Sequence, residues 1–229
     1  MATGMSEQVK DKSAAYYDKL YRAREVYHKH YSDTFYFVQW VQVEMMLRPF
    51  KNKNILEIGC GPGQLAHYLQ DKGYSHYRGF DFSAEAIDRA KNTCTQTFFT
   101  GDAFDPALYT PPTDAVVCLE VLEHLENDID VLKLIKEGTF IIIGVPNFDD
   151  PGHVRWFRNQ YQIRKRYFKY IDIKKIYFIN NIYLFSGTRS NFKPGLFQLL
   201  FATREQINIS SFLKRLKHRI VHLFKIKHT

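Results

Sequence analysis

Long apolar runs, cysteines and, in the last third of the chain, acidic side chains are all scarce in these 229 residues. The longest candidate apolar run, Phe140–Val145, has six residues, whereas a bilayer span needs ~18. No basic segment followed by an apolar one opens the chain, which argues against a cleaved secretion signal. Cys60, Cys94 and Cys118 are too few and too scattered for a disulfide framework or a zinc cluster. We therefore expect a reducing, cytoplasmic setting.

Charge is divided unevenly along the chain. Residues 1–150 hold 15 Lys and Arg against 22 Asp and Glu, a net charge of −7. Residues 151–229 hold 17 against two, a net charge of +15, so that the whole chain carries +8. A strongly basic third favours an anionic partner such as phosphate, nucleic acid or a lipid surface. A solvated basic face that aids solubility is the alternative.

Short apolar runs alternate with helix-like stretches in the middle of the chain. The runs are Asn54–Ile58, Tyr77–Phe82, Thr97–Thr100, Ala115–Leu119 and Phe140–Val145. The stretches between them are Gln64–Asp71, Ala84–Asn92 and about Val121–Lys136. This alternation predicts βαβ units and an α/β fold with a doubly wound, Rossmann-like parallel sheet.

The two ends of the chain differ from this central pattern. Residues 14–47 have apolar side chains near helical spacing and are expected to be helical. Ile173–Asn180 and Gly195–Arg204 are expected to form a terminal antiparallel hairpin across a polar, glycine-containing excursion. Residues 210–224 have the pattern of a basic amphipathic helix. The predicted division is an N-terminal helical lid, a central domain and a basic C-terminal helix, at residues 1–48, 49–205 and 206–229.

A glycine motif follows the first predicted strand. In Glu57-Ile-Gly-Cys-Gly-Pro-Gly63, three alternating glycines lie between an apolar strand and an apolar helix. Glycines there let backbone N–H groups approach a ligand beside the positive end of a helix. The Gly-x-Gly-x-Gly spacing, with Glu57 ahead of it, argues against a pyrophosphate cofactor and for one with an amino-acid moiety, because a carboxylate there can hold an ammonium group. A tight strand-to-helix turn is the structural alternative.

Two further acids end successive predicted strands. Asp81 closes the second strand about twenty residues after the glycines, an offset at which an acid accepts hydrogen bonds from both ribose hydroxyls. Asp102 follows the third strand, where a carboxylate can accept from an adenine amino group. Each acid alone is more often a helix cap or a turn residue. Together with Glu57, in this order, they indicate one nucleoside-like ligand.

On these motifs the sequence resembles the class I S-adenosylmethionine-dependent methyltransferases over residues 50–205. The resemblance implies a seven-stranded sheet with an antiparallel last strand, and S-adenosylmethionine over the carboxyl ends of the strands. The residues that it implies for the cofactor are Glu57, Gly59, Cys60, Gly61, Gly63, Asp81, Phe82, Asp102, Ala103 and Glu120.

A second motif, Glu120-Val-Leu-Glu-His124, follows the fourth predicted strand. On a helix, Glu120, Glu123 and His124 would occupy positions i, i+3 and i+4 and converge on one face. His153 follows the fifth strand at the same sheet edge. Carboxylates and imidazoles form a mixed O/N site that suits Mg²⁺, Mn²⁺ or Fe²⁺.

This second motif resembles that of two methyltransferase groups, the ubiquinone-pathway O-methyltransferases and the metal-dependent small-RNA 3′-terminal 2′-O-methyltransferases. In the latter group two Glu and two His bind a divalent metal, which by position implies as ligands Glu120, Glu123, His124 and His153. Such a metal lowers the pKa of a bound hydroxyl and holds the nucleophile in line. A metal-free site is the alternative, in which Glu120 lines the methionine pocket. In either case the catalytic candidates are His124 and His153.

These features favour an O-methyltransferase that acts on a hydroxyl of a saccharide or polyol, phosphate- or lipid-linked. An RNA ribose 2′-O-methyltransferase is the alternative, and a cofactor-binding interaction protein without catalysis is a third hypothesis. The expected partners are an anionic small-molecule or glycan substrate and, less favoured, nucleic acid. The C-terminal helix is expected on an anionic membrane surface at the inner face. Docking on the domain or on a second subunit of a homodimer is its alternative.

Overall fold

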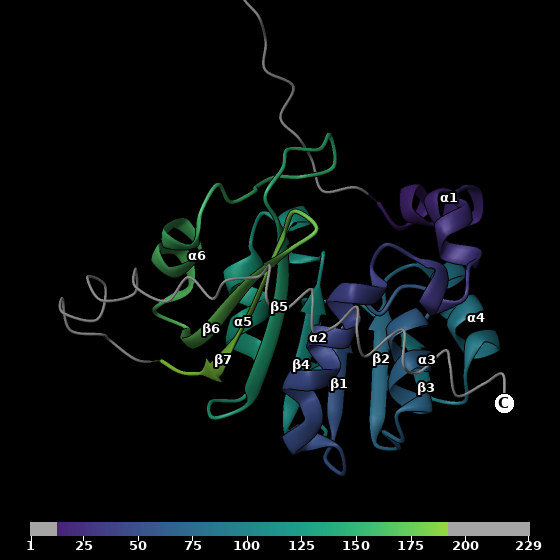
Figure 1. Cartoon of the computed structure of the whole chain (residues 1–229), viewed down its shortest axis with the longest axis horizontal. Coiled ribbons are helices and arrows are strands. Elements are labelled where there is room, and N and C mark those ends of the chain that lie inside the picture. The colour runs from purple at the N-terminus through teal and green to yellow at the C-terminus, as the bar shows by residue number, and fades with distance from the viewer. Residues whose placement is uncertain (1–12, 192–229) are drawn as a thin grey trace, which may run out of the picture. The chain divides into compact units, whose positions relative to one another are not determined.

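Seven strands form a single sheet in the computed structural model, which describes residues 13–191 (Figure 1). The order is β3-β2-β1-β4-β5-β7-β6, with β1 to β5 parallel and β7 antiparallel to both its neighbours. This confirms the predicted Rossmann-like sheet and its antiparallel last strand. The strands are β1 (Ile55–Ile58), β2 (Tyr77–Asp81), β3 (Thr97–Thr100), β4 (Ala115–Leu119), β5 (Phe140–Pro146), β6 (Ile171–Ile179) and β7 (Ile182–Arg189).

Helices pack on both faces of the sheet (Figure 1). Because side chains alternate along a strand, Ile55 of β1 belongs to one core and Leu56 to the other. The core around Ile55 includes side chains of α2, α3 and α4, and the core around Leu56 includes side chains of α5 and α6. The α-helices are α1 (Ala14–Ala23), α2 (Phe37–Leu47), α3 (Gln64–Asp71), α4 (Ala84–Thr93), α5 (Asp128–Leu134) and α6 (Gln160–Tyr167). The 3₁₀ helices are η1 (Glu25–His28), η2 (Tyr31–Asp33), η3 (Arg48–Phe50), η4 (Pro106–Tyr109) and η5 (Leu122–His124).

The terminal hairpin differs from the prediction in its second strand. Asn180 and Asn181, with φ of 49° and 65°, connect β6 directly to β7. Two left-handed residues are what a tight hairpin turn requires, and asparagine tolerates that conformation. Ile182–Arg189 therefore takes the place in the sheet that was predicted for Gly195–Arg204, and that prediction is wrong. Gly195–Arg204 and the predicted C-terminal helix, residues 206–229, lie outside the described residues.

Two segments predicted as continuous helix are interrupted. The predicted helix from about Val121 to Lys136 consists of η5 and α5. Its broken turn is held by Arg155, whose guanidinium donates to the carbonyls of Leu122, Leu125 and Glu126. The predicted N-terminal helical segment, residues 14–47, divides into α1, η1, η2 and α2.

Two findings concern the cysteines and the possibility of a membrane-spanning helix. Cys60, Cys94 and Cys118 are all free. Among residues 13–191, every helix falls short of the length and apolarity that a bilayer crossing requires.

Candidate functional site

A cavity of about 560 Å³ lies at the carboxyl ends of β1, β2 and β4. The strand order reverses between β1 and β4, and open α/β sheets bind their ligands at such a point. The predicted site residues that line the cavity are Glu57, Gly59, Cys60, Gly61, Asp81, Phe82, Asp102, Ala103, Glu120, Glu123, His124 and His153. Of the predicted set, Gly63 is not among the lining residues.

The glycine motif forms the turn from β1 into α3. Gly59, Gly61 and Gly63 have φ of 68°, 51° and 77°, in the left-handed region that favours glycine. A Cβ on Gly63 would lie 3.0 Å from the Cβ and 3.1 Å from the Cα of Ala90 in α4. Gly63 therefore serves the packing of α3 against α4, whereas Gly59 and Gly61 face the cavity.

Asp81 ends β2 with its carboxylate held in place by three donors. Its Oδ2 accepts from the backbone N–H of Gly61 at 3.0 Å and from the Tyr21 hydroxyl at 3.5 Å. Its Oδ1 accepts from the backbone N–H of Ser83 at 2.9 Å. Burial raises the pKa of Asp81 to about 6, and the two N–H donors oppose that rise. The carboxylate is thus oriented in the cavity, with lone pairs left for hydroxyl donors of a ligand.

Glu57 lies in β1, buried beneath the glycine turn. The Tyr77 hydroxyl of β2 donates a short hydrogen bond to its Oε2. Burial raises the pKa of Glu57 to about 8, against the opposing effect of Tyr77. A cationic group placed beside Glu57 would favour its charged form. Asp102, by contrast, is exposed and accepts from the backbone N–H of Phe104 at 2.9 Å.

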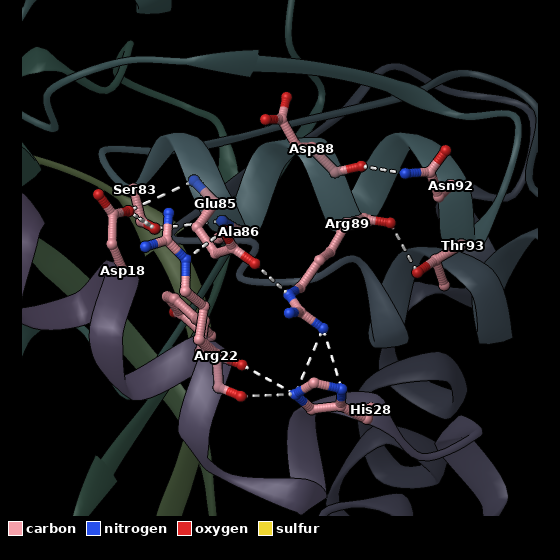
Figure 2. A network of polar contacts seen from close by, with 11 residues as sticks. Asp18, Arg22, His28, Ser83, Glu85, Ala86, Asp88, Arg89, Asn92 and Thr93 are labelled. Carbon is pink, nitrogen blue, oxygen red and sulfur yellow. Dashed lines mark hydrogen bonds and ion pairs between the residues drawn. The ribbon is translucent and has the colours of Figure 1, made fainter.

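A polar network fastens α1 to α4 at the edge of this cavity (Figure 2). Asp18 of α1 accepts from the hydroxyl of Ser83 at 2.5 Å, and Arg22 pairs with Glu85 at 2.7 Å. Glu85 also pairs with Arg89, whose guanidinium lies 3.0 Å from Nδ1 of His28. The network therefore joins α1, η1 and α4.

Aromatic side chains of α1 reach the cavity from this anchored helix. The ring of Tyr17 lies 5.2 Å from that of Phe82 and 5.7 Å from that of His124, measured between centroids. The hydroxyl oxygen of Tyr21 is 3.3 Å from where a Cβ on Gly61 would stand. The N-terminal segment thus contributes side chains both to the glycine turn and to the second motif.

Glu120 and Glu123 lie in the cavity on different backbone elements. Glu120 follows β4 with φ of 55°, and η5 carries Glu123 and His124. The predicted convergence of Glu120, Glu123 and His124 on one helical face is therefore wrong, because the left-handed turn at Glu120 precedes the helix. The structure instead groups Glu123, His124 and His153, whose ligand atoms lie within 4.8 Å of one another.

The Glu123 carboxyl group is fully buried and has no hydrogen-bond partner on either oxygen. Burial, together with the charge of nearby Glu120, raises the pKa of Glu123 well above its ordinary value. Burial also raises the pKa of Glu120 to about 8. A buried polar group without a partner costs free energy. The pair is therefore arranged for a ligand that would compensate the carboxyl groups.

Backbone carbonyls set the tautomers of the two histidines. Nδ1 of His124 lies 2.9 Å from the carbonyl oxygen of Gly152, and Nδ1 of His153 lies 3.2 Å from that of Phe148. A carbonyl only accepts, so each Nδ1 carries the proton and each Nε2 carries a lone pair. Nε2 of His124 is 3.9 Å from Oε1 of Glu123. This arrangement suits either a base or a metal ligand.

The loop after β5 brings His153 to this group. The backbone N–H of Val154 donates to the Glu123 carbonyl at 2.8 Å. Arg155 lies 3.5 Å from Asp128, which also pairs with Arg166 at 2.6 Å. Sequence reasoning missed Arg155 and Asp128 as residues that position the site. A signal was available, because Arg155 stands two residues after the candidate His153.

Both implied groups agree with the residues present. For S-adenosylmethionine, the left-handed glycine turn and the oriented Asp81 form a cradle in which a Cβ would intrude. For a divalent metal, the unpartnered Glu123 carboxyl and two Nε2 lone pairs form an O/N donor set. Glu120 lies outside that group of three, and its role as a fourth ligand stays a prediction.

Comparison with known proteins gives one family match and several relatives. The family model described as a methyltransferase domain matches residues 32–180. The ubiquinone biosynthesis O-methyltransferase of Paraburkholderia phytofirmans is 27% identical over 124 residues, which cover 48% of this chain and 50% of that protein. The chain thus spans about half the length of such curated relatives.

Solved structures share the fold at low identity. The magnesium protoporphyrin IX methyltransferase of Synechocystis PCC 6803 with bound SAM is 17% identical, with a TM-score of 0.60, over 81% of this chain and 100% of the other. The methyltransferase domain of bacterial CtHen1-CN is 21% identical, with a TM-score of 0.53, over 68% of this chain and 100% of the other. The family match agrees with the predicted methyltransferase class, and the solved structures share the predicted fold.

Proposed function

We propose that this chain, which belongs to the methyltransferase-domain family, transfers the methyl group of S-adenosylmethionine to a hydroxyl group of a saccharide or polyol. The observation that carries this proposal is the buried, unpartnered Glu123 carboxyl beside His124 and His153, in the same cavity as the glycine turn. The relatives described above are ubiquinone biosynthesis O-methyltransferases, which supports a hydroxyl acceptor.

The methyl donor would bind in the part of the cavity formed by the glycine turn and the acids of β1 and β2. Asp81 would accept from the ribose hydroxyls, and Asp102 and Ala103 would lie beside the adenine. Glu57 would face the ammonium group of the donor, whose positive charge would favour its ionised form. The glycine turn would admit the rest of the donor close to the backbone.

Methyl transfer from a sulfonium is an in-line displacement, so the protein's task is to position the acceptor and remove its proton. Nε2 of His124 or His153 would accept that proton, each ring being fixed through Nδ1. A divalent metal held by Glu123, His124 and His153 would lower the pKa of the acceptor hydroxyl. The aromatic rings of Tyr17 and Phe148, which line the cavity, would stack on the acceptor.

An RNA ribose hydroxyl is the second candidate acceptor. The net charge of +15 in residues 151–229 favours it, since phosphate-rich ligands bind to basic surfaces. The same charge supports a phosphate-linked acceptor or an anionic membrane surface at the inner face of the cell membrane. Salt separates these possibilities, because RNA binding should weaken steeply as the salt concentration rises.

The test is transfer of a labelled methyl group from S-adenosylmethionine to separate pools of nucleotide sugars, polyols, glycolipids and RNA. We expect one hydroxyl-bearing pool to be methylated, and metal chelation to abolish the transfer. Glu123→Gln and His153→Asn should lose turnover while retaining affinity for S-adenosylhomocysteine. His76→Asn, an exposed histidine outside the cavity, is the matched control. Full activity of Glu123→Gln after chelation would contradict the metal-assisted proposal.

A further inference from the structure

A second group of ligating side chains lies outside the cavity. His30, His67 and Asp71 place one ligand atom each within 4.8 Å of one another, and none of the three lines the cavity. His67 and Asp71 are one turn apart on α3, and His30 directly precedes η2. We propose that these three residues bind a zinc ion that ties the N-terminal segment to α3.

The two ligands on α3 already stand near zinc geometry. Nε2 of His67 lies 4.0 Å from Oδ1 of Asp71. Two ligands bound to a tetrahedral zinc at about 2.1 Å lie ~3.4 Å apart. A side-chain shift of several tenths of an ångström therefore brings both atoms to one ion. His67 is partly buried and Asp71 is exposed, so the site is open to an ion from solvent.

Ser32 orients the ring of His30. Nδ1 of His30 lies 2.8 Å from the Ser32 hydroxyl oxygen, and that hydroxyl donates to Oδ1 of Asp33 at 3.1 Å. The Ser32 backbone N–H also donates to Nδ1 of His30, at 3.3 Å. Both contacts of Ser32 hold the His30 ring through Nδ1, in the way that outer contacts orient metal-binding histidines.

Tyr31 orients the carboxylate ligand in the same way. Its hydroxyl donates to Oδ2 of Asp71 at 2.5 Å, which leaves Oδ1 toward His67. The ring of His67 packs edge-on against Tyr31 at 5.1 Å and against His30 at 5.2 Å. The three ligands are thus held by outer contacts of the kind that metal sites use.

The donor set favours zinc over harder ions. Two imidazole nitrogens and one carboxylate oxygen are a common zinc set, and a fourth position remains for water. Besides the Tyr31–Asp71 hydrogen bond, the segment around His30 is tied to α3 by the Gln64 amide, which donates to the carbonyls of Val26 and Lys29 at 3.0 and 2.7 Å. A bound ion would add a further anchor to the segment that carries Tyr27 into the cavity.

The test uses untagged protein carrying His124→Asn and His153→Asn, which removes the histidines of the cavity group. Titration of this background with Co²⁺ and Zn²⁺ alone should show one bound ion, with the Co²⁺ absorption band of a tetrahedral site. Adding His67→Asn should abolish that band, whereas adding His76→Asn should leave it unchanged. Adding Tyr31→Phe should weaken ion affinity roughly 10-fold or more, since it removes only the group that orients Asp71.

Asp71→Asn keeps an acceptor for Tyr31 and provides a second variant should His67→Asn misfold. It should also lose the ion, and Zn²⁺ should raise the melting temperature of the background protein but not of this variant. Ion binding by both His67→Asn and Asp71→Asn at the affinity of the background would overturn the proposal. These experiments measure ion binding and melting temperature and do not require methyl transfer. Their outcome therefore does not depend on whether the proposed function is correct.

Discussion

Gly63 shows how a single position can combine a backbone and a packing requirement. Its φ of 77° disfavours any side chain, and a Cβ would stand 3.0 Å from Ala90. Gly138 has a similar φ of 88°, but a Cβ there would meet nothing within 4 Å. A substitution at Gly138 therefore tests backbone strain alone, whereas one at Gly63 tests backbone strain together with crowding.

We predict that Gly138→Ala lowers the free energy of unfolding by roughly 1–2 kcal/mol, the cost of a left-handed alanine. Gly63→Ala should lose about 1–3 kcal/mol more, because the methyl group also crowds α4. Urea unfolding of both variants measures the difference. Equal losses would show that α3 and α4 separate without cost and would contradict the packing role of Gly63.

Ser83 links two elements through one hydroxyl group. Its oxygen accepts from the backbone N–H of Ala86 at 3.1 Å, which caps α4, and its proton is donated to Asp18 of α1. Ser83→Ala should therefore cost about 0.5–2 kcal/mol of stability through loss of the cap. Asp18→Asn keeps that cap and weakens only the contact between α1 and α4.

Hydrogen exchange distinguishes these two variants at the level of elements. Amide exchange in α1 should accelerate in both, whereas exchange in α4 should accelerate only in Ser83→Ala. Ser75→Ala, an exposed serine, is the matched control. Unchanged exchange in α1 for both variants would show that the network in Figure 2 does not hold the helix.

The elements that the sequence predicted correctly are those with local signals. The strands β1 to β5 and the helix Gln64–Asp71 appear at or near their expected bounds. In the central strands β1, β4 and β5, burial on both faces leaves a continuous apolar pattern. The sequence prediction misplaces the second hairpin strand, because two consecutive asparagines, Asn180 and Asn181, form the tight turn in place of the expected glycine-containing excursion. The break after Glu120 depends on Arg155, some thirty residues away, which no local pattern shows.

In the candidate site, too, residues with a local sequence signal were predictable and those placed by tertiary contacts were not. Asp81 at the end of β2 and Glu57 beside the glycine motif are predicted from local sequence, and both line the cavity. His153 meets Glu123 only through the Val154 hydrogen bond and the Arg155 contacts, which are tertiary interactions. Tautomers fixed by the carbonyls of Gly152 and Phe148 likewise have no sequence signal.

Buried acids give the whole molecule a characteristic pH dependence. Glu57 and Glu120 have pKa values of about 8 in the folded protein, above their ordinary value of 4.5. The folded state therefore binds more protons than the unfolded state between these values, and stability falls as pH rises from about 5 to about 8. Below the ordinary pKa this contribution is fully present.

We predict that Glu120→Gln flattens this decline in the ligand-free protein, because glutamine stays neutral across the range. Urea unfolding at pH 5.5 and pH 8 measures the slope, with the exposed Glu25→Gln as control. A slope in Glu120→Gln as steep as in the unmodified protein would contradict the buried, protonated state of Glu120.

The central claim is that the glycine turn and Asp81 hold the methyl donor, and calorimetric titration with S-adenosylhomocysteine tests it most directly. We expect one molecule bound per chain, with the affinity reduced about 10- to 100-fold in Asp81→Asn, since hydrogen bonds to a charged acceptor are lost. Asp88→Asn, on the exposed side of α4, should bind as the unmodified chain does. Absence of binding to the unmodified chain, or equal affinity in Asp81→Asn, would contradict the account.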